Sequence, residues 1–262
     1  MPDAKIITHA PEIWGQTNDT LVFDVFIKHL PELLDVYESL IDEESKKTFC
    51  GYWRGMISNR ISEIVCANTP QYICPGFLPK KDDILIDCGV YDGGTSLRFV
   101  NMGCKVYGFE LDEKIFKVAA ELAKKRNFVV ENFGLGSFKH VANSIQMTTI
   151  DSYVGEKNLP RVDFIKMDVE GAELDILKGA AITIMKYKPI LALSAYHKLD
   201  DFWTLMNFVK SLRPDYEFAM RQYATTIEDV SSFFPESVIS FLKSFDLEIN
   251  LPDYNECVLF AR

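Results

Sequence analysis

Residues 84–95 read Ile84-Leu85-Ile86-Asp87-Cys88-Gly89-Val90-Tyr91-Asp92-Gly93-Gly94-Thr95. A short apolar run that meets an acid and three glycines predicts a buried strand entering a tight turn before a helix. Glycine tolerates positive φ and lets a ligand approach the backbone, and the N-terminus of the following helix offers free N–H groups. The turn is therefore predicted to hold a nucleotide.

The spacing of these glycines separates two classes of nucleotide ligand. A dinucleotide site has the pattern G-x-G-x-x-G, in which the middle glycine makes room for pyrophosphate. Here Tyr91 stands two positions after Gly89, and the pattern is D-x-G-x-x-x-G from Asp87 to Gly93. A carboxylate at the strand end can face a cationic amino group, and S-adenosylmethionine (SAM) carries one. Tyr91 therefore favours SAM over NAD.

A second strand ends in an acid further along the chain. It reads Lys105-Val106-Tyr107-Gly108-Phe109-Glu110, and Glu110 follows Asp87 by 23 residues. An acid at about this spacing accepts the ribose hydroxyls of an adenosine ligand. NAD and SAM share that contact, so Glu110 supports adenosine without choosing between the two. The structural alternative is a glycine turn with an unrelated surface glutamate.

Length and composition restrict the function classes. A chain of 262 residues suits one α/β domain with an extension, or two small domains. Its net charge of −10 argues against an extended nucleic-acid face, because phosphate binding needs clustered Lys and Arg. Six cysteines without a C-x-x-C pair, no signal peptide and no membrane-length apolar run predict a cytoplasmic protein with no membrane span.

The first part of the chain has a helical pattern. We assign residues 1–80 to a helical extension and residues 81–262 to the main domain. A helix expected from about Asp42 carries an aromatic stripe, which predicts a buried core or the interface of a homodimer. A substrate contact for part of it is the alternative, since extensions of α/β domains often cover the site. The stripe consists of Phe49, Tyr52, Trp53, Met56 and Ile57.

After residue 81, apolar runs alternate with amphipathic stretches. Strands are expected at about 83–88, 104–110, 128–131, 162–167, 190–195, 216–221 and 256–261. One helix is expected to pack through residues 172–184, and residues 222–255 are a candidate lid that carries Phe233 and Phe241. Such alternation predicts a parallel sheet that binds its ligand at the carboxyl ends of the strands.

Three of the expected strands end in acids, which gives the sheet one acidic edge. Asp168 and Glu170 follow the fourth strand, in addition to Asp87 and Glu110 on the first two. For Glu170, complementing the N-terminus of its own helix is the alternative. His197 is the one histidine predicted at this edge, which makes it a candidate base.

Assembled in order, these residues resemble the FkbM-type SAM-dependent methyltransferases from about Ile84 to Phe260. The Tyr196-His197-Lys198 run is similar to a bacterial, sugar-modifying subset of that family. The resemblance rests on Asp87 to Gly93, Gly108-Phe109-Glu110, Thr149-Ile150-Asp151, Ile165-Lys166-Met167-Asp168-Val169-Glu170-Gly171-Ala172-Glu173 and Leu177-Lys178-Gly179-Ala180.

The resemblance implies a fold and a reaction. The fold is a Rossmann-like, class I methyltransferase sheet of strand order 3-2-1-4-5-7-6 with the last strand antiparallel. The reaction is methyl transfer from SAM to a hydroxyl of a small polar acceptor, with S-adenosylhomocysteine as product. A nucleotide-linked sugar of bacterial surface polysaccharide is the expected acceptor. Gln222 stands where relatives often have histidine, which puts more weight on His197.

Each candidate site residue has an expected role. His197 is the candidate base, and Asp168 and Glu170 would orient it or the acceptor. Substrate contacts are expected from Lys166, Tyr196, Lys198 and Arg221, whose cations could hold a phosphate. The cofactor is expected to contact Asp87, Gly89, Tyr91, Asp92, Gly93, Thr95, Glu110, Leu111, Gly134, Leu135 and Asp168.

No metal is expected, because the acids and His197 show no tight ligand spacing. The alternative gathers Asp168, Glu170 and His197 around Mg²⁺ or Mn²⁺. Two other functions stay open at this point. One is an NAD-dependent oxidoreductase, and the other is a non-catalytic binding protein with a SAM-type fold.

Overall fold

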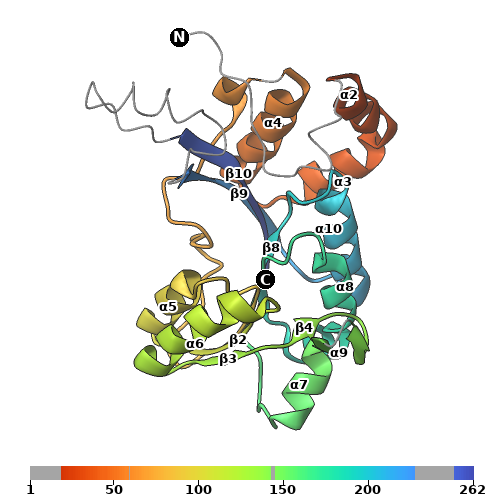
Figure 1. The fold of residues 1–262 in the computed structure, drawn as a ribbon. Helices are drawn as coiled ribbons and strands as arrows, with labels where there is room; N and C mark the ends of the chain where they lie inside the picture. The colour runs from red at the N-terminus through yellow and green to blue at the C-terminus, as the bar shows by residue number, and fades with distance from the viewer. Residues whose placement is uncertain (1–18, 59, 143–144, 228–250) are drawn as a thin grey trace, which may run out of the picture.

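The computed structural model describes residues 19–58, 60–142, 145–227 and 251–262 (Figure 1). Within these ranges, seven strands form the central sheet in the order β3-β2-β1-β7-β8-β10-β9. Strand β10 is antiparallel to β8 and β9, and the other neighbours are parallel. The expected order 3-2-1-4-5-7-6 is therefore confirmed. The bounds are β1 Ile84–Cys88, β2 Lys105–Phe109, β3 Val129–Glu131, β7 Phe164–Met167, β8 Ile190–Ser194, β9 Phe218–Ile227 and β10 Leu251–Ala261.

Helices cover both faces of this sheet (Figure 1). Helices α5 (Gly94–Asn101) and α6 (Glu113–Arg126) lie on one face. Helices α7 (Ile150–Glu156), α8 (Glu173–Lys178), α9 (Ala181–Tyr187) and α10 (Asp201–Leu212) lie on the other. No helix in the described ranges has both the length and the apolar character needed to cross a membrane.

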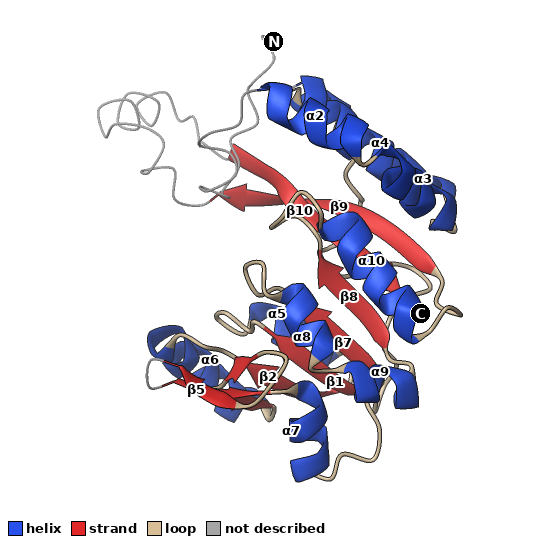
Figure 2. Cartoon of the chain, turned by 90° about the vertical axis from the view of Figure 1, so that its right-hand side faces the viewer, coloured by secondary structure: helices blue, strands red, loops and turns tan. Residues whose placement is uncertain are grey.

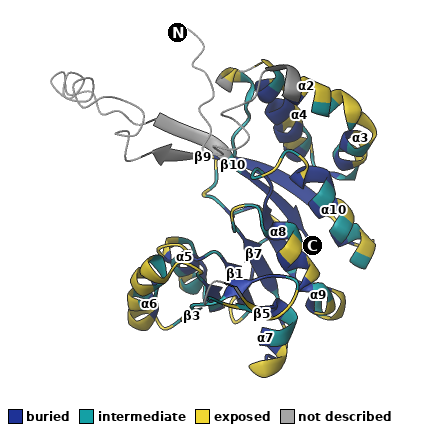
Figure 3. Cartoon of the chain, turned by 45° about the vertical axis from the view of Figure 1, so that its right-hand side comes forward, coloured by how far each residue is buried: buried dark blue, intermediate teal, exposed yellow. Residues whose placement is uncertain are grey.

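Strand β1 shows why its sequence is continuously apolar. Side chains of successive strand residues point to opposite faces, and both faces of this strand are covered. Ile84 and Ile86 belong to the core on the α8 side, whereas Leu85 belongs to the core on the α5 side. All five residues of β1 are buried (Figure 3). Because β1 is packed on both faces, the glycine turn that follows it has a fixed position at the sheet edge.

The first helices pack against the last strands of the sheet (Figure 2). They are α2 (Asp19–Lys28), α3 (Leu30–Ser39) and α4 (Glu43–Ser58), and a short 3₁₀ turn, η1 (Ile61–Glu63), follows. The rings of Phe49, Tyr52 and Trp53 surround Phe202 of α10 at centroid distances of 6.1, 4.7 and 6.2 Å. These three rings are buried, so the aromatic stripe forms core within the chain.

Two features differ from the sequence predictions. The single helix expected over residues 172–184 is two helices, α8 and α9, because the chain at Gly179 packs against the backbone of Gly136. A Cβ at Gly179 would lie 2.1 Å from the Gly136 carbonyl oxygen. A small sheet of β4 (Gly134–Leu135), β6 (Ile145–Thr148) and β5 (His140–Ala142), in that order, was not predicted. Most of the candidate lid, including Phe233 and Phe241, lies outside the described residues.

Candidate functional site

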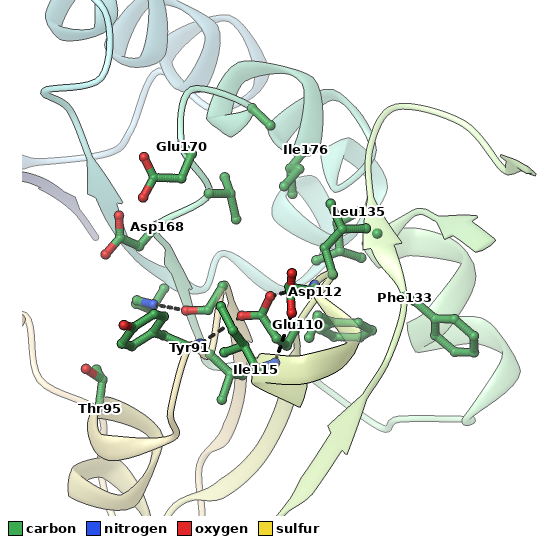
Figure 4. Close-up of a pocket in the computed structure, with 18 of the residues that line it drawn as sticks. Tyr91, Thr95, Glu110, Asp112, Ile115, Phe133, Leu135, Asp168, Glu170 and Ile176 are labelled. Carbon is green, nitrogen blue, oxygen red and sulfur yellow. Dashed lines mark hydrogen bonds between the residues drawn. The ribbon is translucent and has the colours of Figure 1, made fainter. Parts of the chain in front are cut away.

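A cavity of about 580 Å³ opens at the carboxyl ends of β1, β2 and β7 (Figure 4). We call one part the glycine end, which comprises the lining residues within 89–95, 109–115 and 133–135. The acidic end comprises Gln71, Asp168, Glu170 and Glu256. In Figure 4, Asp168 and Glu170 lie on the side of the cavity opposite Phe133 and Leu135. The cavity thus occupies the edge at which the sequence predicted a ligand.

The turn after β1 requires glycine for two reasons. Gly89 and Gly93 have φ of 80° and 90°, in the left-handed region that disfavours other residues. A Cβ on Gly89 would also lie 1.8 Å from the carbonyl oxygen of Asp168. Asp92 accepts a hydrogen bond from the Gly94 amide at 2.8 Å, which closes the first turn of α5. The predicted glycine turn is confirmed, and it brings the end of β1 into contact with the end of β7.

Glu110 is held rigidly at the end of β2. Its Oε2 accepts a hydrogen bond from the Tyr91 amide at 2.9 Å, and its Oε1 accepts one from the Asp112 amide, also at 2.9 Å. Each oxygen of a carboxylate has two acceptor positions, so one remains on each. The Glu110 carbonyl is fixed in turn by the Asn132 side chain at 2.8 Å. This carboxylate can accept hydrogen bonds from two neighbouring hydroxyls.

An apolar slot lies beside Glu110. Gly134 makes the slot possible, because a Cβ there would lie 2.1 Å from the sulfur of Met147. A slot of this kind suits a flat heteroaromatic ring, which buries its faces against apolar side chains. Its walls are Leu111, Ile115, Phe133, Leu135, Met147, Ala172 and Ile176.

Asp87 does not face the cavity, contrary to the sequence prediction. Its side chain is fully buried under the turn, where Oδ2 accepts from the Ser96 hydroxyl at 2.5 Å. Its Oδ1 lies 3.0 Å from the ammonium of Lys166, which also donates to the Gly89 carbonyl at 2.5 Å. Burial alone would lower the pKa of Lys166, but Asp87 and Asp168 raise it above its ordinary value. The charge of Asp87 is therefore balanced within the protein.

Asp168 is the central carboxylate of the acidic end. Its Oδ2 accepts from the Tyr72 hydroxyl at 2.7 Å, and its Oδ1 accepts from the Tyr196 hydroxyl at 3.2 Å. Burial opposes ionisation, but the charge of Lys166 and the hydroxyl of Tyr72 outweigh it and hold the pKa of Asp168 below its usual value. Asp168 is accordingly a carboxylate anion at the cavity wall.

His197 is buried behind this wall. Its Nδ1 lies 2.8 Å from Oε1 of Glu173, and its Nε2 lies 3.6 Å from both Asp168 Oδ1 and Glu170 Oε2. Burial would lower the pKa of His197, but Glu173 and the other two acids raise it to about 8. The ring is not part of the cavity lining, whereas Asp168 and Glu170 are. His197 therefore meets the cavity through these two carboxylates.

The other cations expected to hold a phosphate are engaged elsewhere. Lys198 donates to the carbonyl of Gly171. Arg221 is buried, 3.2 Å from Asp42 and 3.1 Å from Glu44, so it ties β9 to the start of α4. Neither side chain lines the cavity in the described part of the chain.

The structure separates the predicted site residues into two groups. Those that line the cavity are Gly89, Tyr91, Asp92, Thr95, Glu110, Leu111, Gly134, Leu135, Lys166, Asp168 and Glu170. Those outside the lining are Asp87, Gly93, Tyr196, His197, Lys198 and Arg221.

Four residues in the acidic end or directly behind it had no predicted role. Gln71 and Tyr72 come from the segment before β1, where no sequence pattern indicated a site, and Glu256 comes from β10. Glu173 ends the Asp168-to-Glu173 motif, whose spacing of acids was the one available signal. Gln71 donates to Glu256 at the cavity wall, which joins two segments that are far apart in the sequence.

Comparison with known proteins gives two kinds of likeness. Residues 130–243 match the sequence profile of the methyltransferase FkbM domain, and no curated protein sequence matches the chain. The fold is similar to that of methyltransferase FkbM from Methylobacillus flagellatus KT, with a TM-score of 0.73 and 22% identity over 91% of this chain. The likeness spans 60% of that longer protein.

A second solved structure is more distant. It is precorrin-6y C5,15-methyltransferase from Geobacter metallireducens GS-15, with a TM-score of 0.46 and 12% identity, covering 71% of this chain and 82% of that one. The profile match and the order of the seven described strands agree with each other and with the motifs of residues 84–180. Residues 130–243 therefore carry the sequence profile of the methyltransferase FkbM domain, and the chain shares the fold of a solved methyltransferase FkbM.

Proposed function

We propose that this protein is a SAM-dependent O-methyltransferase that acts on a hydroxyl of a sugar. The observation that carries the proposal is Glu110, fixed by two backbone amides at the end of β2 beside an apolar slot. A ribose diol fits this carboxylate, and an adenine ring fits the slot. The match of residues 130–243 to the methyltransferase FkbM domain supports the same ligand.

The residues present also fit the rest of SAM. Its sulfonium and amino groups are cationic, and the acidic end offers carboxylates to both. Asp87 was expected to meet the amino group, but Lys166 already balances it, so we assign this role to Asp168. Bound SAM supplies a methyl group activated for transfer. The chain has to align the acceptor with that methyl group and to receive one proton.

Asp168 and Glu170 are the groups that we expect the acceptor hydroxyl to meet. Both line the cavity, and a carboxylate oxygen can accept a hydrogen bond from a hydroxyl. Bound SAM would give its methyl group to the acceptor oxygen and keep the S–CH₃ electron pair on sulfur, and Glu170 would take up the hydroxyl proton and release it to solvent. The Glu170 side chain is 92% exposed, which allows this last transfer. His197 acts through the two carboxylates as a positioning residue.

The resemblance of the sequence motifs to FkbM-type methyltransferases suggests a sugar, expected to be nucleotide-linked, as the acceptor. A polar rim of carboxylates and the Gln71 amide suits a molecule with several hydroxyls. The nucleotide link expected from the sequence depended on Lys166, Lys198 and Arg221, whose charges are met inside the chain. The cavity therefore supports the sugar part of that proposal better than the phosphate part.

The remaining parts of the proposal come from sequence reasoning. We propose that the protein works in the cytoplasm, in keeping with six free cysteines, on a sugar destined for surface polysaccharide. We also propose a division into residues 1–80 and 81–262, and a homodimer as the assembly to test. Size-exclusion chromatography with light scattering would detect that dimer.

Binding and turnover test the proposal in two stages. Calorimetry with S-adenosylhomocysteine should give heat and a stoichiometry of one per chain, whereas NADH should give none. Binding of NADH without S-adenosylhomocysteine would replace the proposal with the oxidoreductase. A panel of free and nucleotide-linked sugars is then incubated with SAM and analysed by mass spectrometry for the gain of one CH₂. Cofactor binding with no methylated product on any hydroxyl would support the non-catalytic alternative.

A further inference from the structure

The environment of His197 is unusual for a buried imidazole. Its Nε2 faces Asp168 Oδ1 and Glu170 Oε2 at 3.6 Å each, which exceeds the ~2.7–3.2 Å of an N–H···O hydrogen bond. The side chain is 8% exposed, and neither ring nitrogen meets the geometry of a hydrogen bond among the described residues, although Nδ1 lies 2.8 Å from Glu173. Buried polar atoms are normally hydrogen-bonded, so an unpartnered nitrogen that faces two carboxylates needs an explanation.

The spacing of these atoms suits ligands of one shared cation. Nitrogen and oxygen ligands lie about 2.0–2.2 Å from a small divalent cation, which puts neighbouring ligands about 3.0–3.6 Å apart. The two separations of 3.6 Å are at the upper end of this range. Asp168 and His197 belong, with Glu173 on the other side of the ring, to a group whose ligand atoms all lie within 4.8 Å of one another. Glu170 approaches from the solvent side, where its exposed side chain can rotate toward the same point.

Glu173 supplies the second feature of a metal-binding histidine. Such a histidine donates its other ring N–H to a carboxylate, which fixes the tautomer and the orientation of the ring. Here Nδ1 lies 2.8 Å from Oε1 of the fully buried Glu173. Glu173 also accepts the Val169 amide at 3.1 Å, so its own position is fixed. With one proton kept on Nδ1, a cation that displaces the Nε2 proton would meet a lone pair directed at Asp168 and Glu170.

We propose that His197 Nε2, Asp168 Oδ1 and Glu170 hold a divalent cation of the Mg²⁺ and Mn²⁺ class at the acidic end of the cavity. Two carboxylates favour such hard cations, and one imidazole is compatible with Mn²⁺. Local sequence spacing led us to expect no metal, but these side chains come from the separate ends of β7 and β8 and converge only in the fold.

The role of the cation rests on the proposed function, although its binding does not. Asp168 and Glu170 line the cavity, so a cation between them would present its open positions to hydroxyls of the acceptor. The pKa of an alcohol lies far above that of a carboxylic acid, so a carboxylate alone is a weak base toward it. A bound cation lowers the pKa of the hydroxyl and narrows this gap. The hydroxyl proton then leaves to solvent through a carboxylate oxygen that does not bind the cation.

Titration of the full chain with Mn²⁺, followed by the EPR signal of the free ion, tests the site. The expected result is one Mn²⁺ per chain, bound at least about tenfold more weakly after His197→Ala or Glu170→Gln. The matched control is His140→Ala on β5, an exposed histidine whose removal should leave Mn²⁺ binding unchanged. Glu170→Gln alters an exposed side chain, so a folded variant is expected even if His197→Ala unfolds.

Two results would overturn the inference: no Mn²⁺ bound by the wild-type chain, or equal binding by the wild type and a folded Glu170→Gln variant. Calorimetry with S-adenosylhomocysteine on the same samples separates this inference from the proposed function. Mn²⁺ binding without any cofactor binding would support the cation site and reject the methyltransferase. Methyl transfer that survives exhaustive chelation, without Mn²⁺ binding, would support the methyltransferase and reject the cation site.

Discussion

The two ends of the cavity are built from different parts of the polypeptide. The glycine end is made mainly by backbone, since amides of the turn and of the α6 start hold Glu110, and glycines clear the space. The acidic end is made by side chains from the segment before β1, the ends of β7 and β8, and β10. The first end depends on chain geometry, and the second depends on balanced charge.

The two ends meet at one point in the structure. Gly89 touches the carbonyl of Asp168, and Lys166 lies beneath both, bound to the Gly89 carbonyl and paired with Asp87. A change at this junction should therefore affect both ends, whereas a change elsewhere should affect one. The substitutions below test that difference.

Removal of the buried ammonium should have the largest effect. Lys166→Met leaves the carboxylate of Asp87 buried without its cation, a change that typically costs about 3–5 kcal/mol of unfolding free energy. Urea unfolding measures this loss, and calorimetry with S-adenosylhomocysteine shows whether the cavity survives. The matched control is Lys117→Met, which breaks an exposed pair with Glu113 and should leave stability unchanged.

The double variant Lys166→Met with Asp87→Asn sharpens this test. It removes both charges, so part of the lost stability should return. If Lys166→Met alone is as stable as Lys117→Met, the pair does not balance charge in the way described.

Gly89→Ala should have the next largest effect. The new Cβ would lie 1.8 Å from the Asp168 carbonyl at a φ of 80°, so the two ends must separate. We expect a loss of about 2–4 kcal/mol in urea unfolding, together with weaker binding of S-adenosylhomocysteine. Gly155→Ala is the control, because nothing lies within 4 Å of its added Cβ. Equal unfolding midpoints for the two variants would contradict the close contact between the ends.

The last prediction concerns charge behind the acidic end and appears as a slope with pH, up to about 1.4 kcal/mol per pH unit. Asp201 is buried at the start of α10, and burial raises its pKa to about 7, although the Lys198 amide opposes this shift. Glu173 raises the same pKa, and His197 lowers it. The folded state therefore binds this proton more tightly than the unfolded chain does. Its stabilising contribution is full below about pH 4 and is lost as the pH rises toward 7.

Asp201→Asn keeps an acceptor for the Lys198 amide and removes the titration. The wild type should lose up to about 1.4 kcal/mol of stability per pH unit from this group, and the variant should show a flatter dependence. Urea unfolding at a series of pH values measures both slopes. Parallel slopes would mean that Asp201 is ionised in the folded protein throughout this range.

The glycine end of the cavity could be predicted from the sequence more completely than the acidic end. The strand order and the glycine end followed from local patterns, because Gly89, Gly93 and Glu110 stand at fixed distances along the chain. The pairing of Asp87 with Lys166 depends on the register of β1 against β7, which sets these two residues side by side. No local pattern encodes that register. Asp87 was therefore assigned to the ligand, although the protein itself uses its charge.

The same limit explains the acidic end. Asp168 and Glu170 could be placed there because they follow a strand. Their partners Tyr72 and His197 come from segments 96 and 27 to 29 residues away. Charge balance at such a site is a property of the folded chain.

The position of Tyr72 also bears on how this protein can be shortened. Gln71 and Tyr72 precede every described strand of the central sheet. The Tyr72 hydroxyl nevertheless donates to Asp168, and the Gln71 amide donates to Glu256. A fragment that starts at residue 81 would keep all the described strands and lose both donors. Such a fragment would lack one wall of the cavity as well as the α4 rings that pack on Phe202, so expression trials should retain both the segment before β1 and α2–α4.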